Sequence, residues 1–171
     1  MKKIANILKL SVFSILLFQV SVAIAVDSKE DTSKSYYKQE PQTITVVSPD
    51  KISWNTMKVF PGALVALLLG DPRKEGPYIL RVKFPSNYII PPNWQTATSF
   101  VTVISGSLHI GVGDNFDRNK GKTLVTENSV VIPSKSHLYF WTTEEVVLQV
   151  HGMGPWDIHY INPGEDPRKH P

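Results

Sequence analysis

The 171-residue chain contains no cysteine. Disulfide bonds and thiolate metal sites are therefore impossible, even though an exported chain would tolerate disulfides. Helical periodicity is also missing, because no segment after residue 26 repeats its apolar residues with the spacing of a helix. Stability must come from an apolar core. The part of the chain that can build it, residues 43–169, is long enough for one such core and no second.

One long apolar run is present, and it lies at the N-terminus between Ile4 and Ile24, after Lys2 and Lys3. It ends in Ala23-Ile24-Ala25, a small-x-small pattern that predicts a signal peptide over residues 1–25 and a periplasmic or secreted protein. An uncleaved anchor is the alternative, since the run approaches the ~20 residues that span a bilayer. Polar residues interrupt the run and no stop-transfer sequence follows, which favours cleavage and no stable membrane anchor.

Charge of one sign is not in excess once the signal peptide is removed. The whole chain has 18 Lys and Arg against 15 Asp and Glu, and without Lys2, Lys3 and Lys9 the two numbers are equal. Nucleic acid and anionic lipid both require clustered positive charge, so we expect neither as a partner.

Residues 26–42 are polar and include a run from Asp27 to Lys34 without an apolar side chain. Such a segment buries too little apolar surface to become ordered, so we predict a flexible tether. The domain itself is predicted to span residues 43–169.

From residue 43 onward, short runs of Val, Ile, Leu and aromatic residues alternate with Gly, Pro, Asn and Asp. We predict strands at residues 43–47, 57–60, 64–69, 78–84, 100–104, 107–112, 122–125, 130–132, 138–142, 146–151 and 158–161. Many short strands at this spacing are typical of an all-β sandwich or jelly roll.

Two local patterns sharpen this prediction. Tyr78, Leu80, Val82 and Phe84 share one face of a strand, and Ile79, Arg81 and Lys83 share the other, which predicts a strand with one buried face. The runs at 100–104 and 107–110, joined by Ser105-Gly106, predict a hairpin.

The tetrapeptide Asp-Pro-Arg-Lys occurs at 71–74 and 166–169, and each copy is predicted to form a turn.

The segment from Tyr88 to Gly106, with Ile90-Pro91-Pro92 near its start, resembles the first motif of the cupin family. In that motif a glycine, two histidines, a glutamate and a second glycine stand at fixed spacing. Those five places fall, in order, at Asn87, Asn93, Gln95, Ser99 and Gly106.

The segment from Glu127 to Thr142 resembles the second cupin motif, which consists of a glycine, Pro-x-Gly, a histidine and an asparagine. Those places fall, in order, at Glu127, Pro133, Lys135, Leu138 and Thr142. The resemblance covers residues 43–169 and implies a cupin-type double-stranded β-helix, that is, a jelly-roll barrel.

In cupins the three histidines and the glutamate form a metal cage, because side chains two apart on a strand point to the same side. Here the cage positions hold Asn93, Gln95, Ser99 and Leu138. Carboxamides and a hydroxyl bind first-row metals far more weakly than imidazole and carboxylate, and leucine cannot bind at all. We therefore predict a degenerate metal site and no cofactor, with a divalent transition metal as the alternative.

Three further residues are candidates for the ligand pocket. His137 precedes the expected histidine position by one, and it would face inward if a bulge at residues 134–136 shifted the register; otherwise it is exposed. Gln149 and His151 share one face of a strand, while Val146 and Leu148 share the other. Parity alone does not decide which of these faces is inside.

Three functions follow from these residues. The first is a metal-free binding module for a small neutral ligand or an envelope protein partner. The second is an enzyme, either a metal-dependent dioxygenase or isomerase or a metal-independent epimerase, that uses His137 or His151 with Tyr139 or Tyr160. The third is a structural role through a homodimer, which cupins commonly form.

Overall fold

The computed structural model describes residues 44–169, so the predicted signal peptide and tether lie outside the described residues. The strands are β1 (Asn55–Met57), β2 (Phe60–Leu69), β3 (Gly76–Phe84), β4 (Ile89–Gln95), β5 (Ser99–Ser105), β6 (Ser107–Val112), β7 (Lys122–Val125), β8 (Ser129–Ile132), β9 (Leu138–Trp141), β10 (Val146–Gly154) and β11 (Ile158–Tyr160). Three short 3-10 helices are η1 (Pro49–Lys51), η2 (Arg118–Lys120) and η3 (Pro163–Glu165). Within residues 44–169, no helix has the length and apolar character needed to span a bilayer.

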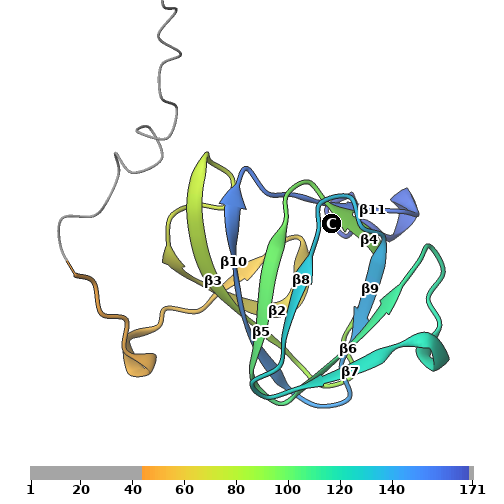
Figure 1. Cartoon of the computed structure of the whole chain (residues 1–171), viewed down its shortest axis with the longest axis horizontal. Helices are drawn as coiled ribbons and strands as arrows, with labels where there is room; N and C mark the ends of the chain where they lie inside the picture. The colour runs from red at the N-terminus through yellow and green to blue at the C-terminus, as the bar shows by residue number, and fades with distance from the viewer. Residues whose placement is uncertain (1–43, 170–171) are drawn as a thin grey trace, which may run out of the picture. The chain divides into compact units, whose positions relative to one another are not determined.

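The strands form two antiparallel sheets (Figure 1). The six-stranded sheet has the order β1-β2-β3-β10-β5-β8, and the five-stranded sheet has the order β11-β4-β9-β6-β7. From β3 onward the chain passes repeatedly from one sheet to the other, as in a jelly roll. The predicted all-β jelly roll is confirmed, but the two sheets stay separate and do not close into one continuous barrel.

The core lies between the inner faces of the two sheets. On β3 the side chains of Tyr78, Leu80, Val82 and Phe84 are all buried, and the residues between them are partly exposed. This alternation confirms the predicted buried face. On β10 the buried side chains are Val146 and Leu148.

The predicted hairpin at residues 100–110 is wrong. β5 pairs with β10 and β8 in the six-stranded sheet, whereas β6 pairs with β7 and β9 in the five-stranded sheet. Gly106 therefore forms a corner at which the chain crosses between sheets. The physical reason is that both edges of β5 are taken by strands that come later in the sequence.

Three further strand predictions need correction. The predicted strand at 57–60 is a turn instead, because β1 ends at Met57 and β2 begins at Phe60. The described part of the predicted strand at 43–47 contains no strand, and Ile44 and Val46 are 93% and 81% exposed. Conversely, β4 was not predicted as a strand, because Pro91-Pro92 is a strong break signal. The structure accommodates these prolines at an irregularity in the pairing with β9, between Ile90 and Asn93.

Left-handed backbone occurs where the motif alignment places a glycine. Asn87, Glu127 and Lys135 have φ of 59°, 73° and 61°, and they are the three non-glycine residues of the described chain with positive φ. Gly106, at the fourth such place, has φ of 77°. The turns of both motifs are therefore retained in the backbone although three glycines are replaced. This agreement is independent of side-chain identity and supports the alignment.

We expect Glu127→Gly and Lys135→Gly each to stabilise the fold. A left-handed residue with a Cβ costs about 1–2 kcal/mol, and the extra entropy of unfolded glycine offsets about 0.5–1 kcal/mol of that gain. A net increase of about 0.5–1 kcal/mol in the free energy of unfolding should appear in urea titrations.

Asn87→Gly is the matched control and should change stability little, since asparagine tolerates left-handed backbone. Gly106→Ala should be destabilising by about 2–4 kcal/mol, because the new Cβ would overlap the carbonyl oxygen of Glu145. Unchanged stability of all four variants would contradict the role given to these turns.

Candidate functional site

A cavity of about 290 Å³ lies between the two sheets. Its wall is almost entirely apolar and draws on both sheets. The apolar lining consists of Met57, Val59, Phe60, Val65, Pro72, Leu80, Val82, Phe84, Ile90, Val101, Leu108, Ile132, Phe140, Leu148 and Val150, with the rings of Tyr78 and Trp156. This differs from the polar pocket predicted from the sequence.

A short chain of hydrogen bonds forms the polar corner of the cavity. The Ser99 hydroxyl donates to Oε1 of Gln95 over 2.6 Å, and the Trp156 indole Nε1 donates to the same oxygen over 3.0 Å. Ser99 has one hydroxyl proton, so the Tyr78 hydroxyl, 3.5 Å away, is the donor toward Ser99. Burial raises the pKa of Tyr78, and the contact with Ser99 partly offsets this, so Tyr78 is a neutral donor.

Gln95 lines the cavity, and its amide nitrogen has a donor to spare. Its oxygen accepts two hydrogen bonds, which fixes the amide orientation and directs Nε2 the other way. Among the described residues Nε2 has no hydrogen-bond partner, yet it is not one of the fully buried unsatisfied atoms. A ligand atom that accepts a hydrogen bond could therefore contact Nε2.

Asn93, Ser99 and Leu138 are buried, with exposed fractions of 0%, 0% and 3%, and they do not line the cavity. Gln95 is also buried, so the predicted parity of the four motif positions agrees with the structure. Asn93 is paired with Leu138 across β4 and β9. Its Nδ2 donates to the carbonyl of Pro91 over 2.7 Å, and its Oδ1 is the one fully buried side-chain polar atom of residues 44–169 without a partner.

His137 lies outside the cavity. Leu138 is buried, whereas His137 is exposed and bonds through Nδ1 to the carboxylate of Asp114. The register shift that would have turned His137 inward is therefore absent.

Gln149 and His151 face outward on β10, opposite to Val146 and Leu148. Gln149 accepts a long hydrogen bond of 3.4 Å from Arg81. His151 is exposed and stacks on Phe100, with 5.0 Å between ring centres. Gln149 and His151 therefore do not line the cavity, and of the seven residues predicted for the ligand pocket Gln95 alone does.

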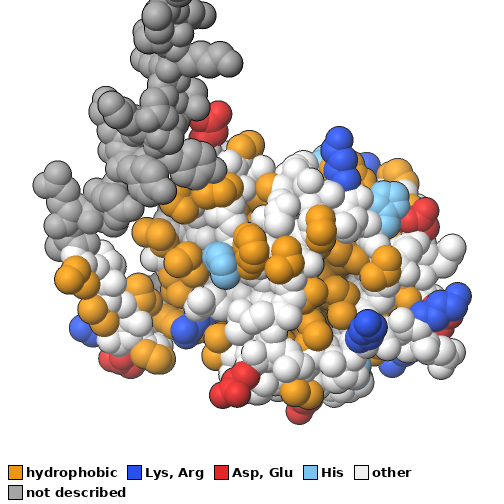
Figure 2. Space-filling model, in the orientation of Figure 1, with side chains coloured by type: hydrophobic (Ala, Val, Ile, Leu, Met, Phe, Trp, Pro, Cys, Tyr) orange, Lys and Arg blue, Asp and Glu red, His pale blue; other side chains and the backbone are white. Residues whose placement is uncertain are grey.

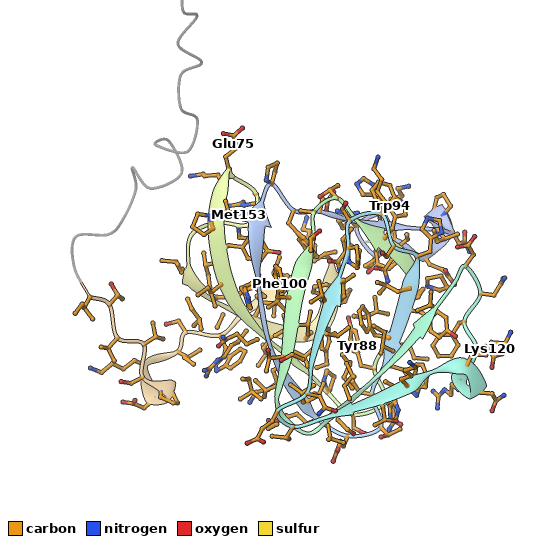
Figure 3. The ribbon with its side chains drawn as sticks, in the orientation of Figure 1. Glu75, Tyr88, Trp94, Phe100, Lys120 and Met153 are labelled. Carbon is orange, nitrogen blue, oxygen red and sulfur yellow. The ribbon has the colours of Figure 1, made fainter. Side chains whose placement is uncertain are left out.

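Trp94 also faces away from the cavity, between the buried Asn93 and Gln95, and Figure 3 shows it at the outer edge of the fold. Its ring stacks on His159 with 4.2 Å between centres.

The comparisons with known proteins identify the fold of the chain. No protein-family model matches the chain, and no curated protein matches it. The polyketide cyclase RemF of Streptomyces resistomycificus has a similar structure, with a TM-score of 0.62 at 14% identity over 74% of this chain and 92% of that one. An RmlC-like cupin of Shewanella frigidimarina matches with a TM-score of 0.51 at 12% identity, over 65% and 91% of the two chains.

The chain has a cupin fold. KdgF of a Halomonas species is a further similar structure, with a TM-score of 0.51 at 15% identity over 66% and 96% of the two chains. At these identities the likeness extends to the fold and not to the chemistry, so the site has to be judged from its own residues.

The residues at the cupin metal positions do not fit a metal ion. Gln95 already uses its oxygen for two donors and Leu138 has no ligating atom. Asn93 Oδ1 is unpartnered, but a single carboxamide oxygen binds a first-row metal only weakly. Imidazole, carboxylate and thiolate are the side chains that hold first-row metals. Within residues 44–169, no three histidine or acidic side chains come together as a candidate metal site.

Several lining residues were not singled out from the sequence. Tyr78 and Trp156 complete the polar corner, and Lys58, Arg73, Asp157 and Arg168 add charge to the cavity wall. The buried parity of β3 could have identified Tyr78. The repeated Asp-Pro-Arg-Lys tetrapeptide could have drawn attention to Arg73 and Arg168.

Replacing Gln95 by methionine should destabilise the protein. The Trp156 N–H and the Ser99 hydroxyl would both lose their acceptor, and a buried donor without a partner costs about 1–3 kcal/mol. Urea unfolding measures the difference. Gln149→Met, which removes a half-buried amide from the outer face, is the control and should stay within about 0.5 kcal/mol of the parent. Equal effects of the two substitutions would mean that the hydrogen bonds of the polar corner do not add to the free energy of unfolding.

Proposed function

We propose that this protein is an exported binding module that holds a small, mainly apolar ligand in the cavity between its sheets, without a bound metal. The observation that supports this is the 290 Å³ cavity, whose apolar wall is interrupted by one polar corner. Ligand pockets are typically apolar clefts with a few placed polar groups that fix orientation. Gln95 Nε2 is the group that would orient the ligand here.

An enzymatic role finds less support in the same residues. In the part of the chain that the structure describes, the cavity lining contains no histidine to serve as general base. The hydroxyls of Tyr139 and Tyr160 donate to the carbonyls of Asp117 and Val59. His137 and His151 are exposed, so neither forms a buried pair with those tyrosines.

The structural likeness to a polyketide cyclase agrees with an apolar ligand but does not carry the proposal. At 14% identity, it is the fold that the two chains share. The proposal rests on the cavity of this chain alone.

We expect one molecule of an uncharged apolar amide, such as decanamide or naphthamide, to bind per chain. The cavity has room for about ten water-sized groups of about 30 Å³ each. A dissociation constant between about 1 μM and 1 mM, or about 4–8 kcal/mol, is reasonable for a ligand of this size. Isothermal titration calorimetry measures the affinity and the stoichiometry.

Val101→Phe and Leu148→Phe enlarge two lining side chains, and each should weaken binding at least about tenfold, since the new ring occupies ligand space. Val112→Phe adds the same ring at the end of β6, at a 79% exposed position that is not part of the cavity lining, and is the control. Absence of saturable binding to the parent protein would refute the proposal, and so would a near-stoichiometric transition metal retained after dialysis.

A second candidate function, homodimer formation, is favoured by the outer face of the six-stranded sheet. The strand pairings align Leu69, Ile79, His151, Phe100 and Val131 in one row across β2, β3, β10, β5 and β8. Leu69, Phe100 and Val131 are 42%, 42% and 56% exposed. Figure 2 shows hydrophobic side chains gathered on this face, where Figure 3 labels Phe100 and Met153.

The occupant that suits this row best is a second copy of the chain. A two-fold interface brings the same patch of both subunits together, so it must be complementary to itself. A row with four aliphatic or aromatic residues and one histidine meets this condition, since it needs no opposite charge on the partner.

Phe100→Asp should convert a dimer into a monomer, because each interface would then bury two like charges. Sedimentation equilibrium measures the mass. Val112→Asp, at an exposed position where β6 of the five-stranded sheet ends, should leave the dimer intact. A parent protein that is monomeric at about 100 μM would rule out this second candidate.

A further inference from the structure

The mouth of the cavity is formed by connections that contact one another. Trp156 N, between β10 and β11, donates to the carbonyl of Pro72, between β2 and β3, over 2.6 Å. Tyr160 in β11 donates to Val59, between β1 and β2, over 3.1 Å. The charged lining residues of the cavity come from these connections and from the C-terminal turn. The mouth is therefore the charged end of an otherwise apolar cavity.

Two of the charged residues belong to the repeated Asp-Pro-Arg-Lys turns. In both turns the aspartate Oδ1 accepts from the backbone N and from Nε of the arginine two residues later, over 2.9–3.0 Å. The second oxygen accepts from Nη2 over 2.8 Å for Arg73 and 3.0 Å for Arg168. The same local geometry thus presents one arginine from each turn to the cavity mouth.

The two arginines differ in whether a guanidinium nitrogen is left without a hydrogen-bond partner. Arg168 also donates from Nη1 to Asp157 over 2.7 Å and from Nη2 to the carbonyl of Ile158 over 2.7 Å, so all three of its nitrogens are engaged. Arg73 uses Nε and Nη2 for Asp71, and its Nη1 has no partner among the described residues. Arg73 is held in place by Asp71 and still has a donor directed elsewhere.

Lys58 is the second cation of the lining with donors to spare. Its side chain is exposed, and no carboxylate of residues 44–169 lies within ion-pair distance of it. The one acid of the lining, Asp157, accepts from Arg168 and from the backbone N of Ile158. Cations with unused donors therefore outnumber acids at the mouth.

We propose that the ligand is an amphipathic carboxylate whose apolar body occupies the cavity and whose carboxylate lies at the mouth beside Lys58 and Arg73. This inference rests on the proposed binding function and names the chemical class of its ligand. A carboxylate accepts charge-assisted hydrogen bonds, which are stronger than neutral ones, and arginine and lysine are its usual partners.

The test compares acids with uncharged amides of the same shape. Decanoate and naphthoate should bind about tenfold more tightly than decanamide and naphthamide at low salt, since each pair differs only in the head group. The preference should shrink on raising the ionic strength from about 0.05 M to about 0.5 M, because the head group lies at an exposed mouth. Calorimetric titration supplies both affinities.

Lys58→Gln with Arg73→Gln should abolish this preference, so that acids and amides of the same shape bind with similar affinity. Arg118→Gln with Lys122→Gln, which removes two exposed cations that are not part of the lining, is the charge-matched control and should preserve it. Thermal unfolding of all variants verifies that they are folded.

The outcomes separate the two proposals. Amides that bind while acids gain no advantage would overturn the carboxylate inference and leave the binding function standing. A preference for acids that survives the Lys58 and Arg73 substitutions would also overturn it, since the carboxylate would then lie elsewhere. Failure of both acids and amides to bind would refute the binding function itself.

Discussion

The strict alternation of side chains along each strand is the constraint on which this structure depends. In two facing sheets every inward residue must be covered, so a buried polar atom needs a partner from a neighbouring strand or connection. Gln95 meets this requirement, because its oxygen is shared by Ser99 from β5 and Trp156 from the loop after β10. One amide thereby joins two consecutive strands to a loop 61 residues further along the chain, and it marks the polar corner of an apolar cavity.

The same alternation explains which residues could be assigned to the inside of the fold from the sequence and which could not. Asn93, Gln95 and Ser99 could be assigned to the inside because their spacing matches a known motif and their parity is consistent. Gln149 and His151 could not, since β10 has apolar residues on one face and mixed residues on the other. Only the pairing of Leu148 with Val82 on β3 decides the question, and that pairing joins residues 66 positions apart. The false hairpin at Ser105-Gly106 has the same origin, because the competing partners of β5 are distant in the chain.

Backbone and side chains have diverged differently in this cupin fold. The turns of both motifs keep left-handed residues at Asn87, Glu127 and Lys135, where glycine would be less strained. A position that retains an unfavourable backbone conformation after losing its glycine is held there by the surrounding strands. The inward side chains face no such geometric demand, so imidazoles can give way to an amide, a hydroxyl or a leucine while the sheets stay the same. Fold and ligand chemistry are therefore separable here, residue by residue.

The charges at the mouth follow from the apolar character of the cavity. A charged group placed deep between Leu80, Val101 and Phe140 would lose its hydration without compensation, whereas at the rim it keeps contact with water. Arg168 illustrates the structural use of such a position, since it ties the C-terminal turn to Asp157 and Ile158. Arg73 lies in the same kind of turn, but within residues 44–169 its side chain bonds to Asp71 and to no other segment. An arginine held by its aspartate has already lost much of its side-chain freedom, so a ligand that contacts it has less order to impose.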